Sequence, residues 1–183
     1  MSSQFDFSTF SDGLRPMTSS DLLSVLELRN HIEIRKYMLT QHEISLEEHT
    51  AWFNRASQTA GTELLILEIS NKCSGFVQFK ETNCRGVVDW GFYVAPDSPK
   101  GTGRNLGMAA LSCIFRKDYI HKICGQALDW NKPSIQYHKS LGFTQEGVLR
   151  EQYFDGEVYH ALVCFGILKR EWMAAESLKG KSR

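Results

Sequence analysis

The sequence predicts one α/β domain built on a single mixed β-sheet. Segments rich in β-branched and aromatic residues alternate with segments whose apolar residues recur every three or four positions, as in strands and amphipathic helices. No internal repeat or linker divides the 183 residues, and their 42% hydrophobic content is ordinary for a packed domain. We expect the domain to span residues 14–170, with residues 1–13 and 177–183 as loose tails.

The first part of the chain predicts a short strand and two helices. Residues 14–17 form an edge strand, because Pro16 cannot donate a hydrogen bond within a sheet. Residues 18–21 are a variant of the capping box, a pattern that starts helices, and the helix continues to residue 38 in a more polar form. A second capping box at residue 45 opens another helix that runs to about residue 57.

Three consecutive strands and a helix follow. The strands are expected at residues 64–69, 75–81 and 87–94, separated by residues that favour turns. After Gly103 the apolar positions change to a helical spacing, so the third strand leads into an amphipathic helix.

The last part of the chain predicts a strand, a helix and a hairpin. The strand covers residues 121–128 and the helix covers residues 131–141. Two further strands, 143–152 and 157–168, form a hairpin about the two-residue turn Asp155–Gly156, and a short helix follows. The complete predicted order is β-αα-βββ-α-β-α-ββ.

Composition narrows the partners of the protein. The 21 basic residues equal the 21 acidic residues, so there is no basic excess to favour nucleic acids or acidic membranes. No apolar run approaches the roughly 20 residues that span a bilayer, and the first residues lack the basic region of a secretory signal. The five cysteines lack the spacing of a metal site. We expect a cytoplasmic protein with reduced thiols, no metal, and neither nucleic acid nor membrane as partner.

The turn between the third strand and its helix contains Gly101 and Gly103. A helix N-terminus directs free N–H groups and a partial positive charge outward, and glycine lets the backbone close around a ligand, so this turn predicts an anion site. The spacing to Gly107 is one residue too long for a dinucleotide fingerprint, and no Gly-Lys-Ser/Thr closes the turn as in a P-loop. The alternative is a plain strand–helix turn.

Two sequence patterns resemble those of the GNAT superfamily, the acyl-CoA-dependent N-acetyltransferases. The first is a pyrophosphate loop, Gln/Arg-x-x-Gly-x-Gly/Ala after a strand that ends in Val-x-Pro. Residues 98–103 match this loop except that Ser98 replaces the Gln or Arg. The second is Asn-x-x-Ala/Ser followed by Tyr-x-x-x-Gly-Phe, which residues 131–143 match with Tyr137 one residue farther from Gly142.

The resemblance implies the GNAT fold, a mixed and mostly antiparallel sheet of about seven strands with helices on both faces. It implies direct acetyl transfer from acetyl-CoA to an amine, with Tyr137 as general acid, because a phenol stays protonated at neutral pH. The coenzyme contacts that it implies are Phe92, Val94, Lys100, Gly101, Thr102, Gly103, Arg104, Asn131 and Ser134. The alternatives are a core tyrosine at position 137 and a simple helix N-cap at position 131.

The first half of the chain must recognise the acceptor, because the family generally builds its acceptor site there. Arg29 and Arg35 would grip phosphate or carboxylate through bidentate hydrogen bonds. Trp52 would stack on a base or cover a sugar, and His49 would bind phosphate or relay the proton of the amine. Taken singly, such residues are more often solvated helix faces or core anchors.

As a set, these positions resemble the N-acetyltransferases of the pseudaminic acid pathway. That resemblance implies that the acceptor is the 4-amino group of a UDP-linked 4-amino-4,6-dideoxy sugar destined for flagellin. The candidate acceptor-binding residues are Arg29, Asn30, Arg35, His49, Trp52, Gln78 and Lys80, the last two on one face of a strand.

Two alternative functions stay open. A protein N-terminal acetyltransferase of the ribosomal-protein type shares residues 141–150 and the later Glu171–Trp172, although the arginines argue against a cationic peptide. A non-catalytic acetyl-CoA-binding domain would not need Tyr137. The general base stays open among His49, Asp89 and Glu33, and the protein is either a monomer or a homodimer.

Overall fold

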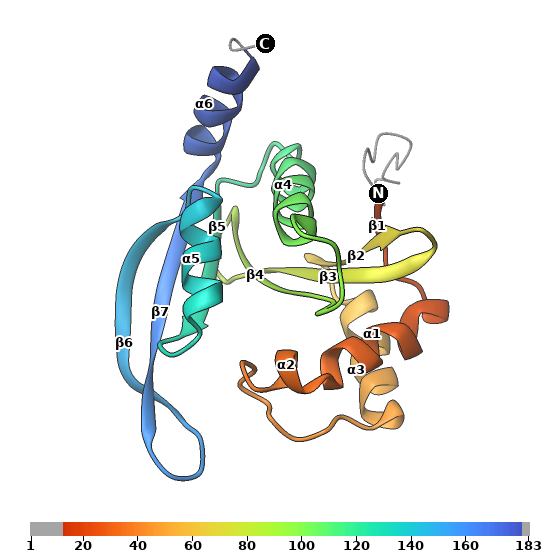
Figure 1. The fold of residues 1–183 in the computed structure, drawn as a ribbon. Helices are drawn as coiled ribbons and strands as arrows, with labels where there is room; N and C mark the ends of the chain where they lie inside the picture. The colour runs from red at the N-terminus through yellow and green to blue at the C-terminus, as the bar shows by residue number, and fades with distance from the viewer. Residues whose placement is uncertain (1–12, 181–183) are drawn as a thin grey trace.

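The computed structural model describes residues 13–180 and contains one seven-stranded sheet flanked by helices (Figure 1). The strands are β1 (Leu14–Pro16), β2 (Thr62–Ile69), β3 (Lys72–Glu81), β4 (Val87–Val94), β5 (Lys122–Leu128), β6 (Thr144–Phe154) and β7 (Tyr159–Leu168). The helices are the 3-10 turn η2 (Ser19–Asp21), α1 (Leu22–Asn30), α2 (Ile32–Arg35), α3 (Leu46–Gln58), α4 (Thr102–Phe115), α5 (Lys132–Ser140) and α6 (Lys169–Gly180). The predicted fold class is confirmed.

The sheet is mixed and mostly antiparallel, as expected. Its spatial order is β1-β2-β3-β4-β5-β7-β6, and β4 with β5 is the one parallel pair among the described strands. Parallel neighbours need a long crossover connection, and α4 supplies it here. The pairing of β4 with β5 covers three residues of each strand, ending at Asp89 opposite Cys124.

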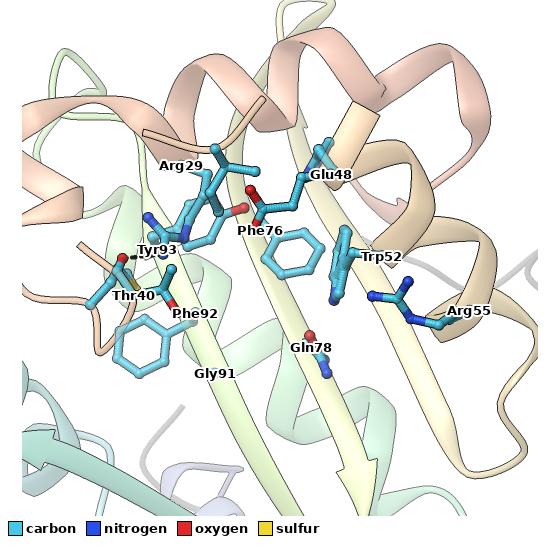
Figure 2. Close-up of a pocket in the computed structure, with 13 residues that line it drawn as sticks. Arg29, Thr40, Glu48, Trp52, Arg55, Phe76, Gln78, Gly91, Phe92 and Tyr93 are labelled. Atoms are coloured by element: carbon cyan, nitrogen blue, oxygen red, sulfur yellow. Dashed lines mark hydrogen bonds between the residues drawn. The ribbon is translucent and has the colours of Figure 1, made fainter. Parts of the chain in front are cut away.

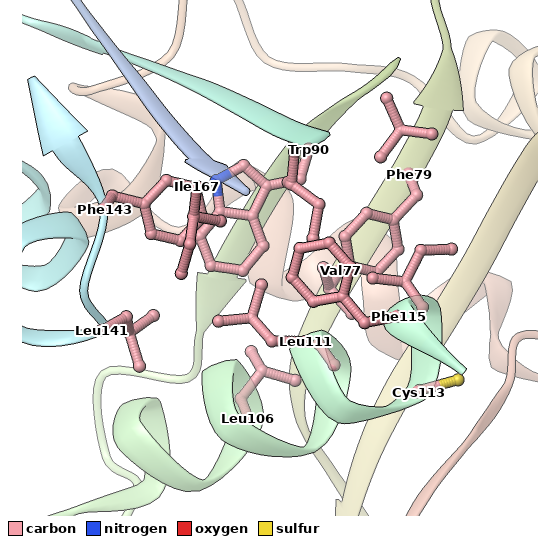
Figure 3. Close-up of a cluster of buried hydrophobic side chains, with 14 of the residues drawn as sticks. Val77, Phe79, Trp90, Leu106, Leu111, Cys113, Phe115, Leu141, Phe143 and Ile167 are labelled. Atoms are coloured by element: carbon pink, nitrogen blue, oxygen red, sulfur yellow. The ribbon is translucent and has the colours of Figure 1, made fainter. Parts of the chain in front are cut away.

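Helices pack on both faces of the sheet (Figure 1). The larger apolar cluster lies on the α4 side and includes Trp90, Leu106, Leu111 and Phe143 (Figure 3). A smaller cluster lies under α1 and α3 and includes Phe76. Alternate residues of a strand point to opposite faces, so neighbouring positions of β3 and β4 serve the two clusters in turn.

The capping box predicted at residues 18–21 is present, and at residue 45 the serine half of the second box is present. The backbone N–H of Thr18 donates to the carboxylate of Asp21 at 2.7 Å, and Arg15 holds the same carboxylate at 2.8 Å. At the start of α3 the backbone N–H of Glu48 donates to the hydroxyl of Ser45 at 3.1 Å. These side chains satisfy N–H groups that have no partner within the helix, which fixes where the helices begin.

The prediction of a continuous helix through residue 38 is wrong. α1 ends at Asn30, and His31 leaves the helical region with a ψ of 132°. Its imidazole accepts a hydrogen bond from the N–H of Glu33 at 3.2 Å and so caps the short helix α2. The chain then forms a loop over residues 36–45, which matters because this loop borders both cavities described below.

Two smaller expectations also need correction. The hairpin between β6 and β7 closes with the four residues 155–158, because the carboxylate of Asp155 accepts from the N–H groups of Glu157 and Val158 at 2.8 and 2.9 Å. The tail expected from residue 177 is helical as far as Gly180 within α6. The rest of that tail and residues 1–12 of the expected N-terminal tail lie outside the described residues.

Candidate active site

A cavity opens where β4 and β5 diverge beyond their short parallel pairing. We call this cavity, of about 240 Å³, the wedge. On the side of β4 that faces β5, no described strand pairs with the chain after Asp89. The lining residues are Tyr37, Met38, Leu39, Trp90, Gly91, Phe92, Gln126, Ala127, Leu128, Asn131, Ser134 and Leu162. The wedge therefore exposes strand backbone in a mostly apolar cleft, a place suited to an extended ligand arm.

The glycine turn lies between the end of β4 and the start of α4. Gly101 takes a left-handed φ of 94° at the helix N-cap, a conformation that favours glycine. Lys100 and Arg104 are exposed beside it. Thr102 is buried instead, and both its N–H and its hydroxyl donate to the carbonyl of Pro99, at 3.1 and 2.8 Å. Thr102 therefore stabilises the turn and does not face the expected anion.

The other predicted coenzyme residues lie around the wedge. Asn131 and Ser134 line it, and the side chain of Asn131 also caps α5 by accepting from the N–H of Ser134 at 3.1 Å. Phe92 lines the wedge as well. Val94 does not line it; its side chain packs against the larger apolar cluster. Asn131 thus combines the two roles that the sequence left open, a cap and a position at the cavity.

Tyr137 lies between α4 and α5. Its hydroxyl donates to the carbonyl of Gly103 at 2.6 Å, and its ring centroid is 4.6 Å from that of Phe92. Burial raises the pKa of the phenol, so it stays protonated at neutral pH. Tyr137 is not among the residues that line the wedge, but it contacts Phe92, which does. The hydroxyl is therefore one side chain away from the cavity.

A second cavity, of about 360 Å³, lies between α1, α3 and the strands β3 and β4 (Figure 2). We call it the α3 cavity. Its lining residues are Arg29, Met38, Thr40, Ile44, Glu48, His49, Trp52, Arg55, Phe76, Gln78, Gly91, Phe92 and Tyr93. Four of the predicted acceptor residues belong to this group: Arg29, His49, Trp52 and Gln78.

Three predicted acceptor residues do not line the α3 cavity. Asn30 is used within the protein, because its amide both donates to the carbonyl of Ile44 at 2.8 Å and accepts from the N–H of Ile44 at 2.9 Å. Arg35 pairs with Glu43 at 3.4 Å. Lys80 is exposed on β3, one step beyond Gln78 on the same face. Asn30 and Arg35 are thus better described as anchors of the loop over residues 36–45.

The α3 cavity contains two buried polar atoms without a hydrogen-bond partner among the described residues, Nη1 of Arg29 and Nε2 of His49. The side chain of Arg29 is held by its other nitrogen, Nη2, which donates to the carbonyl of Thr40 at 2.7 Å. Burial lowers the pKa of both groups, and the charge of Arg29 lowers the pKa of His49 further. Trp52 stacks on His49 with ring centroids 5.0 Å apart. A buried polar group without a partner is costly, so a ligand that supplied partners for these two atoms would be stabilised here.

The two cavities adjoin. Met38, Gly91 and Phe92 line both of them. A donor in the wedge and an acceptor in the α3 cavity would therefore meet across the middle of β4, the arrangement that a direct group transfer requires. Of the three candidates for the general base, His49 lines the α3 cavity, whereas Glu33 and Asp89 line neither cavity.

Sequence reasoning missed Glu48 and Arg55 in the α3 cavity. The signal was available, because positions 48, 52 and 55 share one face of α3 at the helical spacing i, i+4, i+7. Phe76 and Tyr93 were also missed, although Phe76 alternates with Gln78 along β3 in the same way. The loop residues Met38, Thr40 and Ile44 had no comparable periodic signal.

Within residues 13–180, no group of three or more His, Cys, Asp or Glu side chains is placed to hold a metal ion. None of the described helices is long and apolar enough to cross a bilayer.

Comparison with known proteins identifies the family. A family model described as an acetyltransferase (GNAT) domain matches residues 13–144, which is well over half of the chain. The chain belongs to the GNAT acetyltransferases. It is an acetyl-CoA-dependent N-acetyltransferase, and the resemblance that the sequence indicated at this level is confirmed. Acetyl-CoA is therefore the acetyl donor.

Individual relatives of this GNAT protein are distant. An uncharacterized prophage-derived N-acetyltransferase of Bacillus subtilis is 25% identical over 124 residues, covering 66% of this chain and 70% of the relative. Spermidine N(1)-acetyltransferase of Escherichia coli is 20% identical over 171 residues and 92% of each chain. The structure of spermidine N-acetyltransferase from Vibrio cholerae with CoA and spermine superposes with a TM-score of 0.80 at 24% identity, covering 87% of this chain and 96% of that one. At this identity the superposition establishes the fold.

Proposed function

We propose that this GNAT enzyme acetylates the 4-amino group of a UDP-linked 4-amino-4,6-dideoxy sugar. In this proposal acetyl-CoA lies in the wedge with its pyrophosphate at the glycine turn, where the N–H groups of Gly103 and Arg104 in the first turn of α4 would bind it. The other proposed coenzyme contacts are Phe92, Val94, Lys100, Gly103, Arg104, Asn131 and Ser134. Val94 takes part through its backbone, since its side chain packs in the core.

The unpartnered nitrogens of Arg29 and His49 are the observation that carries the choice of acceptor. A guanidinium nitrogen donates hydrogen bonds to oxyanions, and the neutral imidazole can accept a hydrogen bond from a hydroxyl of the sugar. Trp52 lies beside them and offers a flat surface for a uracil ring. A nucleotide diphosphate supplies the oxyanions and the flat base in one molecule.

A polyamine acceptor is the main competitor, because spermidine acetyltransferases are among the relatives. A polyamine carries several positive charges and calls for carboxylates around it. The charged residues that line the α3 cavity are Arg29 and Arg55 against the single carboxylate of Glu48. With His49 kept neutral by its lowered pKa, this balance repels a polycation. The same charge argument applies to the cationic amine end of a peptide.

In the proposed reaction the neutral amine attacks the thioester carbonyl, a C–N bond forms, and the C–S bond breaks. His49 accepts the proton that the amine loses, directly or through water, since its Nε2 is free and unprotonated in one tautomer. Tyr137 gives its phenolic proton to the departing sulfur and regains one from solvent. To do so its hydroxyl must leave the carbonyl of Gly103, to which it now donates.

The proposal is tested by measuring CoA release with three acceptors at equal concentration: the UDP-linked 4-amino sugar, spermidine and an N-terminal peptide. We expect turnover with the UDP-linked sugar at a kcat/KM at least 100-fold above that of the other two. Preferential turnover of spermidine or of the peptide would overturn the acceptor assignment. Binding of acetyl-CoA without turnover of any amine tested would instead favour a non-catalytic domain.

The role of Tyr137 is tested by Tyr137→Phe. Loss of one general acid typically lowers a rate by roughly 10²- to 10⁴-fold. We expect kcat to fall in this range while the Kd for CoA, measured by calorimetry, changes less than threefold. Unchanged kcat would remove Tyr137 from the mechanism. Tyr153→Phe is a matched control, because that tyrosine lies on β6 and lines neither cavity.

A further inference from the structure

His138 is a buried histidine that the proposed mechanism does not use. It follows Tyr137 on α5, and its side chain is 1% exposed. Its Nδ1 lies 2.8 Å from the carbonyl oxygen of Ser134. A carbonyl can only accept, so Nδ1 carries the hydrogen and Nε2 is left as an acceptor. Nε2 accepts the indole N–H of Trp90 at 3.0 Å.

The bond between His138 and Trp90 lies where β4 and β5 separate. The last paired residues are Asp89 and Cys124, so the next positions along the two strands are Trp90 and Gly125. A Cβ atom on Gly125 would lie 2.4 Å from Nε2 of His138 and 2.6 Å from Nε1 of Trp90. Only glycine leaves space for this hydrogen bond at the apex of the wedge. The bond therefore joins β4 to α5 at the point where the sheet opens.

Trp90, held by this hydrogen bond, contacts residues of the proposed donor site. It lines the wedge itself, and its ring centroid is 4.7 Å from that of Phe92. It also stacks against Tyr137 at 6.3 Å with an interplanar angle of 10°. The imidazole of His138 is in turn fixed by a parallel stack on Phe165 of β7, with centroids 4.6 Å apart. A chain of rigid rings thus runs from β7 to the side chain proposed as the acid.

We infer that His138 is a positioning residue that acts through Trp90 to hold the wedge open and its aromatic wall in place for acetyl-CoA. The inference rests on the proposed donor site in the wedge. The role requires a neutral imidazole, because a protonated ring has no lone pair for the indole N–H. Burial lowers the pKa of His138 to about 4, which keeps it neutral across the physiological range.

The test is a double-mutant cycle in which calorimetry measures CoA binding to His138→Leu, Trp90→Phe and the double variant. Leucine leaves the indole N–H buried without an acceptor, so we expect H138L to weaken CoA binding about tenfold. Phenylalanine removes the N–H, so adding H138L to W90F should weaken binding less than twofold further. His138→Gln offers an acceptor oxygen and should stay within threefold of wild type. His121→Leu, at an exposed histidine just before β5, is the matched control.

Unchanged CoA binding in H138L, or a glutamine variant no better than the leucine variant, would overturn the inference. A second measurement needs no variant: ¹⁵N NMR of the free wild-type protein at pH 7 should show His138 protonated at Nδ1 and unprotonated at Nε2. The opposite tautomer, or a charged ring, would also overturn the role. Failure of the proposed function gives a different pattern, since wild-type protein would then bind no CoA or release none with any amine.

Discussion

At the scale of single residues, the main feature of the α3 cavity is the positive charge of Arg29, which forms no ion pair there with a described carboxylate. Arg29 keeps one nitrogen bound to the loop through Thr40 and leaves the other free. His49 is 4% exposed, and Arg29 is one of the two causes of its lowered pKa. The two residues therefore have different roles: Arg29 is a permanent cation, and His49 is a neutral group that can accept a proton.

The state of His49 gives a first prediction. Its pKa is lowered below the ordinary 6.5 by burial and by the charge of Arg29, so His49 stays neutral until the pH falls below that value. In an NMR titration of the histidine ring signals, we expect His49 of the free enzyme to titrate below pH 6.5. Arg29→Gln should raise this midpoint by removing the nearby charge.

Arg35→Gln is the control for this titration, because Arg35 is not among the causes of the shift at His49. A wild-type midpoint at or above 6.5, or an R29Q variant with an unchanged midpoint, would contradict the electrostatic description of the cavity.

At the scale of elements, the close approach of α4 and α5 sets the position of Tyr137. Glycine on α4 makes this approach possible, because a Cβ on Gly107 would lie 2.4 Å from the Tyr137 hydroxyl and 2.6 Å from a methyl of Leu141. The same contact places the hydroxyl beside the carbonyl of Gly103 in the first turn of α4. The helix that presents the anion turn therefore also fixes the proposed acid.

Gly107→Ala tests this packing. Alanine is the better helix former by about 1 kcal/mol, but overpacking a well-filled site typically costs about 1–3 kcal/mol. We expect a small net loss of stability in urea denaturation and, more tellingly, at least a tenfold fall in kcat, because the phenol is displaced. Gly147→Ala on β6 is the matched control, since a Cβ there meets nothing within 4 Å. Full activity in G107A would show that the position of Tyr137 is not critical.

The loop over residues 36–45 shows how one element serves two cavities. Asn30 fixes its end through two hydrogen bonds to Ile44, and Arg29 fixes its middle through Thr40. Met38, between these supports, lines both the wedge and the α3 cavity. Asn30, predicted to contact the acceptor, does not line the α3 cavity, and its amide holds Ile44, which does.

At the scale of the whole molecule, the order of strands and helices could be predicted from the sequence because it depends on local signals. Capping boxes, turn residues and the period of apolar positions all act within a few residues. The break at His31 was not predicted, because the flanking residues are compatible with a continuous helix and the capping bond to Glu33 is seen only in three dimensions.

The site was predictable in part for the same reason. The glycine turn, Asn131 and Ser134 belong to contiguous patterns; the turn begins α4, and Asn131 and Ser134 line the wedge. The α3 cavity draws on two helices, a loop and two strands, so its full lining depends on how distant segments pack. The link between His138 and Trp90 joins residues 48 positions apart and had no local signal at all.

Nucleotide binding in the α3 cavity is tested most directly with two acceptors that differ only in the nucleotide. The kcat/KM of the enzyme is measured with the UDP-linked 4-amino sugar and with the same amino sugar lacking UDP, at saturating acetyl-CoA. If Arg29 and Trp52 bind a nucleotide diphosphate in the α3 cavity, the UDP-linked sugar should be favoured by at least 1,000-fold, about 4 kcal/mol of binding energy. Equal values for the two sugars would contradict the account.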